Sequence, residues 1–224
     1  MIAAATSEIR DGVSVVLRDP LLRTLAAAAG AYNVCGNVLF AVFLLCVTTE
    51  LGLRPATVGF IFSVAGPAAF AGALLSSWVP RRIGLGRTLI GALAVGAAGR
   101  TLIVFAGGPP DVIVGLLIAA RVLLSVWVPI YGVNALSLRQ TITPDHLQGR
   151  VTATMRFIGW GTLPIGSLIG GALGSTIGLR PTIGLAVVGT VVAVIWLVLS
   201  PVRAVQELRP QQVGRASSGY AASG

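Results

Sequence analysis

Six long apolar runs constrain the fold of this chain more than any other feature. Each run is long enough to cross a hydrocarbon core of about 30 Å as a helix. Only 10% of the residues are charged, against roughly 25% in soluble proteins. The sequence therefore predicts an all-α integral membrane protein, a six-transmembrane-helix bundle within residues 21–200. The predicted spans cover residues 22–48, 56–79, 88–106, 112–138, 151–177 and 182–200.

The arginines predict which ends of the spans face the cytoplasm. They gather before the first span, after the second, after the fourth and after the sixth, whereas the opposite side holds only Arg54 and Arg180. By the positive-inside rule, we expect a multi-pass protein of the plasma (inner) membrane with both termini in the cytoplasm. The net charge of +9 thus reflects topology, and no nucleic-acid partner is expected.

The segments outside the spans are short. Residues 1–20 place Ile9, Val13 and Val16 on one side of a predicted amphipathic helix, a connector on the cytoplasmic membrane surface. Residues 201–224 are rich in Pro, Gln, Ser and Gly, which predicts a disordered cytoplasmic tail. No signal peptide is predicted. A connector at the start of the chain favours truncation, a split gene or an internal start over a complete protein.

The fifth span has the pattern of a closely packed helix. Gly166, Gly170 and Gly174 recur every fourth residue, so they line one stripe along which a neighbouring backbone can approach closely. Pro164 removes one backbone hydrogen bond from the same helix and favours a kink. Membrane helices tolerate such residues because neighbouring helices satisfy the freed carbonyl groups.

Two asparagines interrupt the otherwise apolar first span. Asn33 and Asn37 are four residues apart and therefore share one face of the helix. They either line a polar cavity or form interhelical hydrogen bonds, which are worth on average about 0.6 kcal/mol in membranes. Both interpretations stay open. Cys35 and Cys46 lie about 16 Å apart along the same helix, too far for a disulfide, and we expect neither a metal site nor a cofactor.

Arg121 is the main candidate for a functional residue. It lies about 15 Å into the fourth span, near the bilayer midplane. A charge at this depth costs at least about 2.5 kcal/mol and is expected to face a cavity or a counter-ion. No carboxylate of the chain lies at this depth, so the partner is expected elsewhere unless backbone carbonyls and water suffice. The same helix offers three further cavity candidates, Ser125, Tyr131 and Asn134.

Other arginines have simpler interpretations. Arg100 lies a turn or two from the outer end of the third span, so we expect its side chain to extend to the membrane interface. The loop after the second span is either a topology anchor or a gate that pairs with acidic groups elsewhere. Its notable residues are Arg81, Arg82, Gly84 and Arg87.

Residues 139–171, RQTITPDHLQGRVTATMRFIGWGTLPIGSLIGG, give the chain a family resemblance. Together with the six spans and the arginine-rich loop, they resemble the C-terminal half of a major facilitator superfamily transporter, in the efflux branch that includes macrolide and enterobactin exporters. The resemblance implies one six-helix half of a twelve-helix fold. It also implies a second half, which is a separate chain, a missing N-terminal part or a second copy.

The same resemblance implies a function. Such a half would take part in the efflux of small amphipathic or drug-like molecules by proton antiport, with Asn33, Asn37 and Arg121 facing the substrate cavity. The loop motif of the family is matched at Arg82 and Gly84, but its acidic position holds an arginine. The fifth span carries a degenerate copy of the Gly-Pro-rich motif of antiporters, at Pro164, Gly166, Gly170 and Gly171.

Two alternatives remain open and a third is nearly excluded. A permease subunit of an ATP-driven transporter would use residues 139–150 to dock on an ATPase. The chain could also be an inactive truncated transporter fragment. An intramembrane protease needs a histidine within the membrane, but the only histidine, His146, lies in a cytoplasmic loop. We therefore expect a lipid-embedded protein that acts on small molecules and is not an enzyme.

Overall fold

The computed structural model describes residue 17, residues 20–143 and residues 145–200. The predicted connector helix lies almost entirely outside these residues, and the predicted tail lies entirely outside them. The described part consists of helices and short connections. Its elements are α2 (Pro20–Leu45), the π-helical turn η1 (Cys46–Glu50), α3 (Pro55–Ser63), α4 (Ala65–Ile83), α5 (Leu85–Val104), α6 (Pro110–Ile142), α7 (Asp145–Thr176) and α8 (Leu179–Leu199).

Within the part of the chain that the structure describes, six helical segments are long and apolar enough to cross a membrane, which confirms the predicted fold class. They extend beyond the apolar runs at several ends, because the polar residues that flank a run continue the helix. The segments are Leu22–Glu50, Pro55–Ile83, Leu85–Val104, Pro110–Ile142, Leu147–Thr176 and Leu179–Leu199.

The second spanning segment is broken about a third of the way along its length, which the apolar pattern did not predict. Helix α3 ends at Ser63 and α4 begins at Ala65. Pro67 has no amide hydrogen to donate to the carbonyl of Ser63 four residues earlier, so the helical hydrogen-bond ladder loses a bond at this point. The α-helix resumes as the amide of Ala68 donates to the carbonyl of Val64 over 3.3 Å.

The arginine-rich loop is shorter than predicted. Only Gly84 separates α4 from α5. Its φ angle is +85°, a conformation that glycine adopts without steric cost. Its amide donates to the carbonyl of Pro80 over 3.0 Å, and its carbonyl accepts from the amide of Thr88 over 3.1 Å. One residue therefore reverses the chain, and the flanking arginines lie on the ends of helices.

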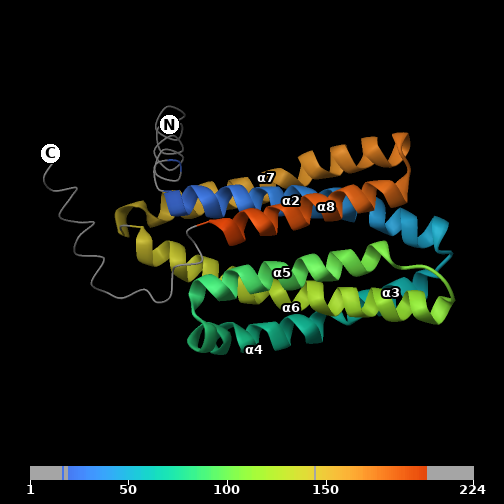
Figure 1. Cartoon of the computed structure of the whole chain (residues 1–224), viewed down its shortest axis with the longest axis horizontal. Coiled ribbons are helices and arrows are strands. Elements are labelled where there is room, and N and C mark those ends of the chain that lie inside the picture. The colour runs from blue at the N-terminus through green and yellow to red at the C-terminus, as the bar shows by residue number, and fades with distance from the viewer. Residues whose placement is uncertain (1–16, 18–19, 144, 201–224) are drawn as a thin grey trace, which may run out of the picture.

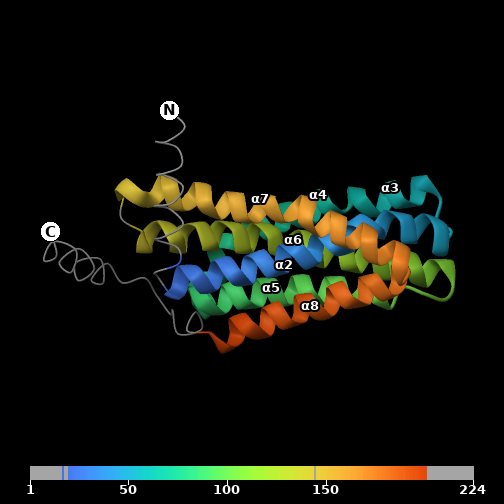
Figure 2. The same cartoon turned by 90° about the horizontal axis from the view of Figure 1, so that it is seen from above.

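The helices form two layers, one of α2, α7 and α8 and the other of α4, α5 and α6 (Figure 1). Helix α2 packs on α7 and α8, whereas α6 packs on α4 and α5. The first helix of each sequence half thus packs on the last two helices of the other half. Helices α5 and α8 join the layers. Figure 2 shows α2 lying between α7 and α8.

The glycine stripe of α7 lies against α2. A Cβ atom at Gly166 would come within 2.5 Å of the Asn37 Cβ, and one at Gly170 within 2.6 Å of the Val38 carbonyl oxygen. At Gly174 the nearest atom is a methyl carbon of Val42, at 2.9 Å. A Cβ at Gly171 would meet no atom of another helix within 4 Å. The spacing of three glycines therefore allows α7 to approach α2 to backbone contact.

Candidate substrate site

A pocket opens between α2, α3, α5 and α6 around Arg121. Its volume is ≈ 40 Å³, room for about three water molecules at about 10–15 Å³ each. A pocket of this size encloses only part of a drug-sized ligand, because complete sites measure about 300–1,000 Å³. Apart from Arg121 its lining is apolar, formed by Leu39, Phe40, Phe43, Ile61, Phe62, Ile103, Leu117, Ala120 and Leu124.

Arg121 carries the only charge in this pocket. The central carbon of its guanidinium group lies 4.5 Å from the centre of the Phe62 ring, a cation–π contact. Its Nε is buried and has no hydrogen-bond partner. Among the residues that the structure describes, the three acidic ones, Glu50, Asp111 and Asp145, lie at helix ends. Arg121 thus stands in an apolar pocket without a carboxylate from the described part of the chain.

Arg100 does not extend to the interface, and the expectation that it would was wrong. Its side chain is buried, with 8% of its surface exposed. One guanidinium nitrogen, Nη1, donates to the carbonyl of Tyr32 and to the hydroxyl of Thr190, both over 2.9 Å. Gly36 leaves the space for this group, since a Cβ there would lie 2.8 Å from the guanidinium carbon. Arg100 therefore ties together α2, α5 and α8.

Tyr131 belongs to an aromatic row and does not line the Arg121 pocket. The ring centres of Tyr131 and Trp127 are 5.8 Å apart, and those of Trp127 and Tyr32 are 4.9 Å apart, both in edge-to-face geometry. Gly96 leaves room beside the Tyr32 hydroxyl and the Trp127 indole nitrogen. Both polar atoms are buried without a hydrogen-bond partner. The row fills the space between α2, α5 and α6.

Asn33 and Asn37 both face α7. The Asn37 side-chain amide donates to the Thr162 hydroxyl over 3.4 Å, a long hydrogen bond. The Asn33 amide nitrogen lies 4.0 Å from the position of a Cβ at Gly159. Neither asparagine lines the Arg121 pocket. Of the two interpretations left open by the sequence, this placement favours interhelical contact.

Asn134 and Ser125 are buried within the bundle. The Asn134 amide nitrogen donates to the carbonyl of Ser76 on α4 over 2.9 Å and to that of Ile130 over 2.8 Å. Asn134 is 5% exposed and Ser125 8%. Neither residue lines the Arg121 pocket. Asn134 thus joins α6 to α4, a contact that sequence spacing within one helix could not reveal.

Replacing Asn134 by leucine is expected to affect stability more than transport. The change removes one interhelical hydrogen bond, so we expect the free energy of unfolding to fall by about 0.6 kcal/mol. Titration with a denaturing detergent, followed by circular dichroism, measures this change. Ser137→Leu, at an exposed position of the same helix, is the control and is expected to leave stability unchanged. Loss of transport at full stability would instead assign Asn134 to the substrate path.

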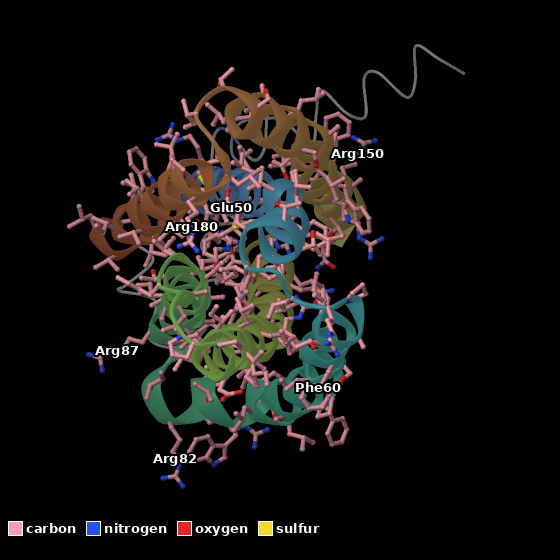
Figure 3. All side chains as sticks on the ribbon, turned by 90° about the vertical axis from the view of Figure 1, so that its right-hand side faces the viewer. Glu50, Phe60, Arg82, Arg87, Arg150 and Arg180 are labelled. Carbon is pink, nitrogen blue, oxygen red and sulfur yellow. The ribbon has the colours of Figure 1, made fainter. Side chains whose placement is uncertain are left out.

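The arginines around Gly84 point away from the bundle. Arg81, Arg82 and Arg87 are exposed, and Figure 3 shows Arg82 and Arg87 extending outward. The Arg82 guanidinium lies 5.4 Å from the Trp78 ring centre. An ion pair lies at the other end of the bundle, where Arg180 Nε is 3.1 Å from a carboxylate oxygen of Glu50.

Within the described residues, six helices long enough to span a membrane and a pocket that holds one arginine, Arg121, are the features of a helical membrane transporter. The sequence model of the Major Facilitator Superfamily matches residues 25–221. The chain belongs to this superfamily, which confirms the resemblance noted from residues 139–171.

One relative carries a name that concerns function. The chain is 28% identical to the multidrug efflux pump Tap of Mycolicibacterium fortuitum over 183 residues, which are 80% of this chain and 42% of that protein. It therefore spans less than half the length of this relative, and it is a transporter half related to efflux pumps. No solved structure gave a significant match.

Proposed function

We propose that this chain forms one half of a secondary transporter that exports small amphipathic or drug-like molecules by proton antiport. Membership of the major facilitator superfamily and the relation to a multidrug efflux pump support this proposal. The observation that carries it is the open pocket with the uncompensated Arg121. A charge placed at this depth without a function would only destabilise the protein.

The proposal includes a second six-helix half, either another chain, an N-terminal part or a second copy. The small volume of the pocket supports it, since a further wall is needed to enclose a drug-sized ligand. Large exposed apolar side chains on α4 and α7 also support it, including Phe70 at 68% and Trp160 at 76% exposed. Such surfaces contact either lipid or another bundle. Rocking of two bundles about a central site would then give alternating access.

We further propose a plasma-membrane location with both termini in the cytoplasm. The exposed arginines at the α4–α5 turn support this orientation, because this turn lies at the opposite end of the bundle from the end of α2 and the α7–α8 turn, which carry Glu50 and Arg180 (Figure 1). Cytoplasmic ends of membrane helices are enriched in such residues.

Dye accumulation in cells tests the transport proposal. Cells that produce the protein, with its companion half where one exists, are loaded with fluorescent amphiphiles of either charge. We expect expression to lower dye accumulation and a protonophore to restore it. Export that depends on ATP after collapse of the proton gradient would favour the permease-subunit alternative. Accumulation that expression leaves unchanged for every dye would contradict the transporter function of this chain.

A further inference from the structure

Within the described residues, the charged side chains that lie away from helix ends are all arginines. Arg100 and Arg121 lie inside helices α5 and α6, whereas the described acidic residues lie at helix ends. Arg100 is occupied by its bonds to Tyr32 and Thr190. Arg121 has an unsatisfied Nε and faces the pocket. The field inside the pocket therefore attracts anions and repels cations, and the apolar surroundings strengthen both effects.

The apolar lining of the pocket indicates a ligand that is more than a counter-ion for Arg121. Three phenylalanines, Phe40, Phe43 and Phe62, line the pocket, and the Phe62 ring lies against the guanidinium group. Phe40 is 62% exposed, so the apolar lining continues to the open side of the pocket. A carboxylate side chain from another bundle would neutralise Arg121 but would leave these apolar surfaces unfilled. A ligand with an acidic head and an apolar body both neutralises Arg121 and covers the apolar lining.

We propose that the Arg121 pocket binds the acidic head of an anionic amphiphile, so that the exported molecules are apolar organic acids. This inference rests on the proposed export function and specifies its substrate class. The guanidinium group is suited to the head because it forms two parallel hydrogen bonds with a carboxylate. The ≈ 40 Å³ volume admits such a head in place of water, and the body of the ligand lies against Phe40 on the open side.

Two photoreactive probes of equal length test this assignment in membranes that carry the complete protein. One is dodecanoate with a diazirine near its carboxylate, and the other is dodecyltrimethylammonium with a diazirine at the corresponding position near its charged group. Labelled peptides are identified by mass spectrometry. We expect the dodecanoate probe to label α2 and α3 around Phe40 and Phe62. Unlabelled dodecanoate should compete for this labelling, and dodecyltrimethylammonium should not.

Three variants refine the test. Arg121→Gln is expected to lower labelling by the dodecanoate probe about tenfold, the effect of losing one charge-assisted contact. Arg121→Lys keeps the charge and should retain most of the labelling. Arg54→Gln, at an exposed residue outside the pocket, is the matched control and should label as the unmodified protein does.

Several outcomes would overturn the proposal. Equal labelling or equal competition by the two probes would show that the pocket has no preference for anions. This comparison uses the unmodified protein, so it holds even if Arg121→Gln does not fold. Absence of pocket labelling by dodecanoate would mean that another group, such as a carboxylate of the companion half, occupies Arg121. Arg121-dependent labelling without proton-dependent export would keep the site and reject the transport function. Export of cationic dyes alone, without pocket labelling, would reject the anion site and keep the transport function.

Discussion

Replacing Gly170 by leucine is expected to detach helix α7 from the bundle. A Cβ at this position would lie 2.6 Å from the Val38 carbonyl oxygen and 3.1 Å from the Val38 Cα. These are backbone atoms of α2, which cannot move aside as a side-chain end can. Because α7 makes most of its contacts with α2, little else would hold it. We expect a loss of about 3 kcal/mol in the free energy of unfolding, the upper end of the range for overpacked interfaces.

Gly171→Leu is the matched control for this prediction. The two glycines are adjacent, but a Cβ at Gly171 meets no atom within 4 Å. Leucine is also the better helix former, by roughly 1 kcal/mol. Thermal unfolding in detergent, followed by size-exclusion chromatography, should show a large loss for Gly170→Leu and none for Gly171→Leu. Equal behaviour of the two variants would show that the stripe does not set the α2–α7 contact.

Arg121→Leu is expected to lower export at least about tenfold while leaving the bundle folded. Removal of a charge from the interior of a membrane helix relieves a cost of at least about 2.5 kcal/mol, so insertion and stability should be unchanged or improved. Export should fall because the pocket loses its only charged group. Initial rates of dye export, normalised to the amount of folded protein, measure the effect.

The control for Arg121→Leu is the same substitution at an arginine that does not line the pocket. Arg54 precedes α3 at an exposed position, and Arg54→Leu should leave the export rate unchanged. An unaltered export rate in Arg121→Leu would remove Arg121 from the transport mechanism. A fall in both rates would indicate a general effect of arginine loss on the membrane-embedded protein.

Much of the architecture followed from the sequence because it depends on local patterns. The six spans follow from runs of apolar residues whose length matches the bilayer. The stripe of Gly166, Gly170 and Gly174 follows from the helical period, and the position of Arg121 from its distance to the helix end. The family followed from residues 139–171. The break at Val64 was missed even though Pro67 signalled it, since hydropathy does not register a lost hydrogen bond.

The remaining features depend on contacts between helices that are far apart in the chain. Arg100 bonds to residues 68 and 90 positions away, and Asn134 bonds to the carbonyl of Ser76, 58 positions away. The sequence by itself determined which segments span the membrane and which helix faces are small or polar. Only the tertiary structure decided that the glycine stripe meets α2, that Arg100 is tied into the bundle and that Arg121 faces a pocket. Helix periodicity assigns each side chain to a face, but the packing of all six helices decides what that face meets.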